Sequence, residues 1–187
     1  MEFLPENIEQ YACSHTQREN AVLTELSRET WAKVLIPRML SGHLQGRTLS
    51  MFSQMIHPKT ILEIGTYTGY SAICLAEGLQ ENGSLHTIDI NEELKSMCER
   101  YFEKAGISKQ VNLHTGNAMD IIPTIDADFD LVFIDADKEN YSNYFDLIID
   151  RMPIGGYIIA DNVLWSGKVV EEVDTKDIET QGLIAFN

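Results

Sequence analysis

Two short apolar runs in the second half of the chain end in polar side chains that could hold a metal ion. The first run leads into Asp135, Asp137 and Lys138, and the second leads into Asp161 and Asn162. Such runs are typical of buried parallel strands, whose carboxyl ends meet at one edge of the sheet. Carboxylate and amide oxygens suit Mg²⁺, and the absence of cysteine and histidine there disfavours zinc. We therefore predict a cation site; the alternative is that these acids cap helices and turns.

A glycine turn earlier in the chain predicts a cofactor site at the same edge. Residues 60–64 form an apolar run, Gly65 and Gly69 follow, and residues 71–79 have the pattern of a helix. A strand, a glycine turn and a helix in this order bind ligands at the carboxyl end of the strand. The third glycine of dinucleotide-binding turns is absent, and Glu63 precedes the turn. An acid there would repel a pyrophosphate but suit the sulfonium and ammonium groups of S-adenosylmethionine.

Two more strands are predicted to end at this edge. Residues 85–89 read as a strand that ends in Asp89, whose carboxylate could accept hydrogen bonds from ribose hydroxyls or could cap the next helix. Residues 111–114 read as the following strand, and residues 116–118 come directly after it. We expect His114 to be a strand residue with a satisfied imidazole rather than a metal ligand.

The sequence before these strands predicts helices that cover the sheet. Residues 1–57 contain three helical segments, and we expect the second to be opened by a capping box of Thr16 and Glu19. The third has apolar residues at helical spacing on one face. We expect that face, which includes Met51 and Met55, to pack on the sheet.

Length and composition indicate a single domain over residues 1–187, with a Rossmann-like core from residue 58 onward. The first ten residues have neither a basic region nor an apolar run, and no later stretch approaches the ~20 apolar residues of a membrane span. We therefore expect a cytoplasmic protein without membrane contact. Three widely spaced cysteines favour reduced thiols over a disulfide or a zinc site.

The charge balance disfavours nucleic acid as a partner. The formal net charge is −15, and the 14 lysines and arginines are scattered along the chain. An acidic protein repels phosphate backbones unless it gathers a basic patch.

Three motifs follow one another in the chain: Glu63-Ile-Gly-Thr-Tyr-Thr-Gly-Tyr-Ser71, Phe133-Ile-Asp-Ala-Asp-Lys-Glu-Asn-Tyr141 and Asp161-Asn-Val-Leu-Trp-Ser-Gly167. Together they resemble the cation-dependent O-methyltransferases of the caffeoyl-CoA and catechol O-methyltransferase type. The likeness runs from about Met39 to Gly167, in the family's order and spacing. It implies an α/β, Rossmann-like methyltransferase fold, with a mostly parallel sheet and helices on both faces.

The resemblance also implies roles for individual residues. Asp135, Asp161 and Asn162 would hold a divalent cation, Mg²⁺ before Mn²⁺ or Ca²⁺, and Lys138 would be the base beside the acceptor hydroxyl. The S-adenosylmethionine site would comprise Met39, Ser41, Glu63, Gly65, Thr66, Tyr67, Ser71, Asp89, Ala118, Asp135 and Asp137.

The chemistry expected from this set is methyl transfer to one hydroxyl of a small aromatic diol. Two adjacent hydroxyls can chelate one cation, which lowers the pKa of the hydroxyl to be methylated. A lysine beside the cation should have its ammonium form disfavoured, so that Lys138 can accept the proton. Both a simple catechol and a caffeoyl-CoA ester remain open as acceptors.

The family's fold continues with a C-terminal β-hairpin, which we expect to be missing from these 187 residues. One edge of the sheet would then be exposed. The resemblance further implies a homodimer.

Three alternatives differ in function. A tRNA hydroxyuridine O-methyltransferase would use the same site but needs an electropositive surface. A binding module without catalysis would have no need of Lys138 and the metal set. A nicotinamide dehydrogenase lacks support because the third glycine is absent.

Overall fold

A parallel β-sheet forms the centre of the computed structural model, which describes residues 5–187. Its strands are β1 (Thr60–Ile64), β2 (Ser84–Asp89), β3 (Val111–Thr115), β4 (Leu131–Ile134) and β5 (Tyr157–Ala160). Their order across the sheet is β3-β2-β1-β4-β5, and every neighbouring pair is parallel. The order reverses at β1, so the ends of β1 and β4 flank the crevice in which such sheets bind ligands.

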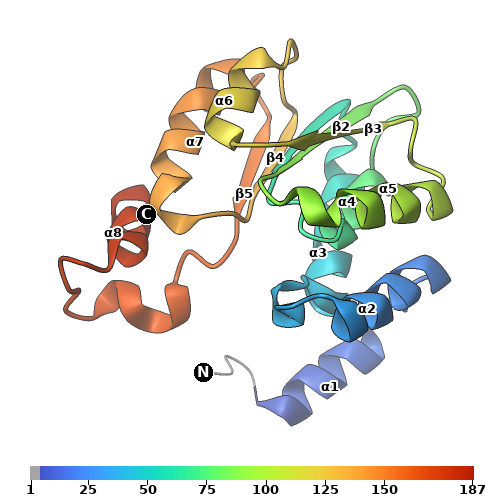
Figure 1. Ribbon diagram of the computed structural model, residues 1–187, viewed down its shortest axis with the longest axis horizontal. Coiled ribbons are helices and arrows are strands. Elements are labelled where there is room, and N and C mark those ends of the chain that lie inside the picture. The colour runs from blue at the N-terminus through green and yellow to red at the C-terminus, as the bar shows by residue number, and fades with distance from the viewer. Residues whose placement is uncertain (1–4) are drawn as a thin grey trace.

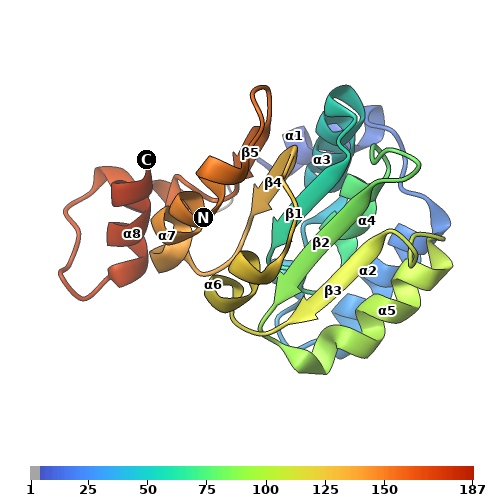
Figure 2. The same cartoon turned by 90° about the horizontal axis from the view of Figure 1, so that it is seen from above.

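Helices cover both faces of this sheet (Figure 1 and Figure 2). They are α1 (Glu6–His15), α2 (Ala21–Lys33), α3 (Gly42–Ile56), α4 (Tyr70–Ala76), α5 (Lys95–Lys104), α6 (Ala118–Ile121), α7 (Tyr141–Ile148) and α8 (Ile178–Phe186). The first five lie toward one face and the last three toward the other. Within the described residues, no helix has the length and apolar character needed to cross a membrane.

The alternation of side chains along each strand explains why both faces are covered. In β1, Ile61 faces the core that includes α2, α4 and α5, whereas Leu62 and Ile64 face the core formed with α6, α7 and α8. All five residues of β1 are buried. A strand that is apolar on both sides can be stable only between two layers of helices, as predicted from its continuous apolar run.

The sheet contains no antiparallel strand within residues 5–187, and β5 is an edge strand. Its first residue, Tyr157, is exposed. Of the first ten residues, residues 1–4 lie outside the described part of the chain. Cys13, Cys74 and Cys98 are free, and the last two are buried.

The face on which α3 packs differs from the predicted one. Met51 and Met55 point outward, and the side chain of Met55 is 74% exposed. The buried residues of α3 are instead Gly46, Arg47, Leu49, Ser50 and Ser53. At Gly46 the helix lies very close to α4: a Cβ added there would lie 2.5 Å from the Tyr70 ring. Arg47 then forms an ion pair of 2.8 Å with Glu77 across this contact. Close backbone approach therefore outweighs burial of the methionines here.

The predicted capping box before α2 is also wrong. Thr16 ends α1, and α2 begins only at Ala21. Its N-cap is Asn20, whose side-chain oxygen accepts a hydrogen bond from Leu23 N at 2.9 Å. Glu19 instead accepts a hydrogen bond from the Tyr70 hydroxyl, so it ties the start of α2 to α4.

We predict that Glu29→Gln lowers the free energy of unfolding by about 1–2 kcal/mol at neutral pH. Glu29 on α2 accepts hydrogen bonds from Arg100 at 2.8 and 3.0 Å and from Tyr101 at 2.6 Å, both on α5. These donors, with Lys33, hold the pKa of Glu29 well below its ordinary value of 4.5. A carboxyl with a lowered pKa stabilises the fold above its unfolded pKa and loses this effect as pH falls. Urea unfolding should therefore show a difference between variant and wild type that shrinks below pH ~4.5; a constant difference would contradict the assignment.

Candidate active site

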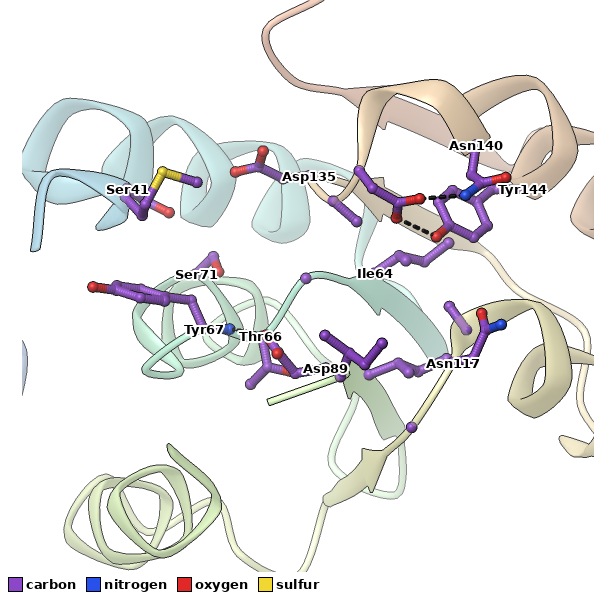
Figure 3. Close-up of a pocket in the computed structure, with 18 of the residues that line it drawn as sticks. Ser41, Ile64, Thr66, Tyr67, Ser71, Asp89, Asn117, Asp135, Asn140 and Tyr144 are labelled. Atoms are coloured by element: carbon purple, nitrogen blue, oxygen red, sulfur yellow. Dashed lines mark hydrogen bonds between the residues drawn. The ribbon is translucent and has the colours of Figure 1, made fainter. Parts of the chain in front are cut away.

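A cavity of about 500 Å³ opens at the carboxyl ends of β1, β2, β3 and β4 (Figure 3). This volume is in the range of pockets for small organic ligands. All the residues predicted for the cofactor site line it, with the exception of Glu63. They are Met39, Ser41, Gly65, Thr66, Tyr67, Ser71, Asp89, Ala118, Asp135 and Asp137.

The glycine turn shapes the floor of the cavity. Gly65 has φ +106°, and a Cβ built there would lie 2.0 Å from the carbonyl oxygen of Asp135. No residue with a side chain fits this position, because β1 and β4 meet there. Gly69 has φ +87° and lies against the ring of Phe102. Both glycines are therefore required by the close approach of neighbouring elements, as well as by backbone conformation.

Asp89 is held in place by backbone donors on both of its oxygens. Its Oδ2 accepts from Tyr67 N at 2.6 Å and its Oδ1 accepts from Asn91 N at 2.8 Å. The N-cap of the next helical segment, Glu92–Leu94, is Asn91, whose side chain accepts from Glu93 N at 3.0 Å, so the predicted capping role of Asp89 is wrong. Asp89 lines the cavity, and each carboxylate oxygen keeps a further lone pair with which to accept a hydroxyl donor.

Glu63 lies beneath the turn rather than in the cavity wall. Its side chain is fully buried, and its Oε2 accepts a hydrogen bond of 2.5 Å from the Thr87 hydroxyl. Burial raises the pKa of Glu63 to about 8, partly offset by hydrogen bonds, so the group is largely protonated at neutral pH. Its Oε1 has no partner among the described residues. Glu63 therefore supports the loop through Thr87, whose hydroxyl is also hydrogen-bonded to the Thr66 hydroxyl.

Sequence reasoning did not find the residues that fix Asp137. The Tyr144 hydroxyl donates to Asp137 Oδ1 at 2.5 Å, and Asn140 donates to Asp137 Oδ2 (Figure 3). Both also line the cavity, as does Asn117 at the start of α6. In the sequence, the sign of this contact was that Tyr144 follows Asp137 by seven residues. A tyrosine on a helix, however, reads first as a core residue.

The predicted metal ligands lie at the ends of β4 and β5, where Asp135 and Asp161 are neighbours. Burial and the charge of Asp161 raise the pKa of Asp135, whereas Lys138 opposes this shift. Gln45 donates to Asp161 Oδ2 at 3.0 Å. Asn162 has a left-handed backbone with φ 57°. Two adjacent carboxylates that destabilise each other's charge form a donor set that a divalent cation would stabilise, so these residues fit the predicted metal.

The metal set is small. No group of three or more His, Cys, Asp or Glu side chains arranged for a metal occurs within the described residues. The protein would therefore supply two carboxylates and the Asn162 amide, and the other positions would be open to water or substrate oxygens.

Lys138 is buried beside these carboxylates. Its side chain has an exposed fraction of only 6%, and Nζ lies 3.0 Å from Asp135 Oδ1. Nζ also donates to the Tyr141 hydroxyl at 2.5 Å, and that hydroxyl donates to the carbonyl oxygen of Asp161 at 3.1 Å. The ring of Trp165 is 5.8 Å from Nζ. Tyr141 is completely buried, so it anchors Lys138 and does not form a wall for a substrate ring.

Comparison with known proteins identifies the family of this chain. Residues 13–187 match a protein family that is described as O-methyltransferase. A catechol O-methyltransferase of Niastella koreensis is 36% identical over 160 residues, which are 83% of this chain and 72% of that protein. Caffeoyl-CoA O-methyltransferase 1 of Arabidopsis thaliana is 37% identical over 163 residues, which are 84% of this chain but only 62% of the plant protein.

Solved structures give the same result for the fold. The O-methyltransferase TomG from Streptomyces achromogenes, crystallised in complex with S-adenosylmethionine, superposes with a TM-score of 0.90 at 31% identity. The match covers 96% of this chain and 82% of that one. The chain therefore belongs to the O-methyltransferase family and has the Rossmann-like fold of S-adenosylmethionine-dependent O-methyltransferases.

Proposed function

We propose that this protein transfers the methyl group of S-adenosylmethionine to one hydroxyl of an aromatic vicinal diol, with the help of a divalent cation. The observation that carries the proposal is the position of Lys138. Its buried amine lies 3.0 Å from Oδ1 of Asp135, one of two adjacent carboxylates, and Asp135 also lines the cavity. Asp135 thus contacts the proposed base, belongs to the proposed cation site and lines the proposed cofactor cavity.

The cofactor would occupy the cavity of about 500 Å³. Asp89 would accept hydrogen bonds from its ribose hydroxyls, since backbone donors already fix the orientation of this carboxylate. Asp137, oriented by Tyr144, would accept from the exocyclic amine of the base. The complex of TomG with S-adenosylmethionine supports this use of the cavity.

Asp135, Asp161 and Asn162 would hold the cation, with Mg²⁺ preferred over Mn²⁺ and Ca²⁺. When bound, the cation would lower the pKa of a coordinated hydroxyl and fix the direction from which that hydroxyl reacts. Gln45 orients Asp161 by its hydrogen bond to Oδ2. The hard oxygen donors of this set and its open positions support this assignment.

Lys138 would take the proton from the hydroxyl that becomes methylated. The Tyr141 hydroxyl and Asp135 hold its amine at the edge of the cavity, where burial excludes bulk water. S-adenosylmethionine, when bound, would supply the methyl group to the oxygen that has lost its proton to Lys138. Positioning of that oxygen relative to the cofactor would be the second large contribution to the rate.

The names of the relatives support two classes of acceptor, simple catechols and caffeoyl-CoA esters. The alternative acceptor, a hydroxylated uridine in tRNA, requires a basic surface, and the net charge of −15 weighs against it. The resemblance is also the basis for proposing a homodimer, which analytical ultracentrifugation would test. We propose a cytoplasmic location as well.

Methyl transfer from labelled cofactor to a panel of acceptors tests this proposal. The panel consists of caffeoyl-CoA, caffeate, catechol and bulk tRNA, each with Mg²⁺ and with EDTA. We expect label in at least one vicinal diol, and only with Mg²⁺. Label in tRNA alone would move the function to RNA modification. Binding of the cofactor without transfer to any acceptor would favour a binding module.

A further inference from the structure

The segment of residues 35–41, which connects α2 to α3, forms one wall of the cofactor cavity. Its last three residues, Met39, Leu40 and Ser41, line that cavity. A short 3₁₀ turn, Pro37–Met39, gives the segment its local shape. Residues on both sides of the exposed part pack against the core: Val34 before it and Leu40 toward its end. The segment is thus fixed at Val34 and at Leu40, and its end, Met39 to Ser41, reaches the cavity.

Between these points the segment has little attachment to the rest of the protein. Leu35 is 95% exposed, and Ile36 and Met39 are also exposed. Among the hydrogen bonds of the described residues, one joins this segment to another element: the Tyr67 hydroxyl donates to the carbonyl oxygen of Ile36 at 2.8 Å. The same carbonyl accepts from Met39 N at 3.0 Å and so also closes the 3₁₀ turn.

Tyr67 is set firmly on the opposite side of this bond. Its backbone has φ +49°, which is a costly conformation for a residue with a side chain. Two contacts hold it there: Tyr67 N donates to Asp89 Oδ2 at 2.6 Å, and the Cys98 thiol donates to Tyr67 O at 3.2 Å. Burial raises the pKa of the Tyr67 hydroxyl, which keeps it a hydrogen-bond donor. A strained residue held from both sides thus aims one hydroxyl at the segment.

We propose that Tyr67 is a positioning residue whose hydroxyl holds the 35–41 segment closed over the bound cofactor and thereby slows cofactor release. This inference rests on the proposed cofactor site. Opening the segment would break the Tyr67–Ile36 hydrogen bond while the packed ends at Val34 and Leu40 act as hinges. A bond of this kind typically changes an opening equilibrium by about 3- to 10-fold.

The variant Tyr67→Phe removes the hydroxyl and keeps the ring. Stopped-flow displacement of S-adenosylhomocysteine from the whole protein should show an off-rate about 3- to 10-fold higher than in wild type. Hydrogen exchange of the free protein should be faster at residues 35–41 and unchanged in β1 and β4. The KM for S-adenosylmethionine should rise by a similar factor.

Tyr101→Phe is the matched control, because it also removes one tyrosine hydroxyl bond, 2.6 Å to Glu29, but away from the cavity. It should lower the unfolding temperature and leave the off-rate as in wild type. An unchanged off-rate and unchanged exchange at residues 35–41 in Tyr67→Phe would overturn the role of the hydroxyl. Failure of the wild type to bind S-adenosylhomocysteine would instead overturn the cofactor site, so the two failures are distinguishable.

Discussion

Replacement of Lys138 by alanine should reduce methyl transfer by about 10²- to 10⁴-fold, which is the usual contribution of a general base. The affinity for S-adenosylhomocysteine should stay within about threefold of wild type, because Lys138 does not line the cofactor cavity. Initial rates at saturating acceptor and calorimetric titration of the cofactor product measure the two effects separately. A loss of turnover with binding intact is the pattern of a group that acts in the transition state.

Two further variants distinguish a lysine that accepts a proton from one that supplies only a positive charge. Lys138→Arg keeps a cation beside Asp135 but cannot give up a proton near neutral pH, so its activity should stay close to that of the alanine variant. Lys168→Ala removes an exposed lysine that pairs with Asp177 at 3.0 Å, and its activity should equal that of wild type. Full activity in the arginine variant would mean that Lys138 supplies only charge.

Replacement of Asp135 by asparagine should reduce acceptor turnover at least ~100-fold and shift the Mg²⁺ requirement to much higher concentration. The substitution keeps the shape of the side chain and removes the charge that faces Asp161 and Lys138. Asparagine is preferable to alanine, because it leaves a polar partner for the buried lysine. Activity measured over a range of Mg²⁺ concentrations gives the shift directly.

Asp137→Asn is the control for this experiment. Asp137 lines the same cavity, but its oxygens accept from Tyr144 and Asn140, so it is assigned to the cofactor. The variant should weaken cofactor binding and leave the Mg²⁺ dependence of the remaining activity unchanged. The same Mg²⁺ dependence in Asp135→Asn as in wild type would remove Asp135 from the metal set.

The side chains that meet at the carboxyl ends of the strands could be predicted from the sequence, because a parallel sheet allows few alternative arrangements of these ends. Apolar runs buried on both faces must end at a common edge, and polar residues that follow them are therefore neighbours. Asp89, Asp135 and Asp161 come from three different strands, and two of them line one cavity while the third adjoins it. Gly65 was predictable for the same reason, since a turn directly after a buried strand must avoid its neighbour.

Some of the positions that were predicted wrongly were decided by close packing between helices. Hydrophobic periodicity assigned Met51 and Met55 to the buried face of α3, but Gly46 allows α3 to approach α4 on another face. The apolar pattern carries no information on how closely two backbones approach. Glu63 shows the same limit: strand alternation cannot tell whether an acid faces the cavity or lies beneath its floor.

The measurement that tests the central claim most directly is methyl transfer to catechol compared with phenol, each with Mg²⁺ and with EDTA. Two adjacent hydroxyls can chelate the cation that Asp135, Asp161 and Asn162 are proposed to hold, whereas one hydroxyl cannot. We predict transfer to catechol with Mg²⁺, at least ~100-fold slower transfer with EDTA, and little transfer to phenol under either condition. Equal rates for both acceptors, or rates unaffected by EDTA, would contradict a cation-assisted reaction at this site.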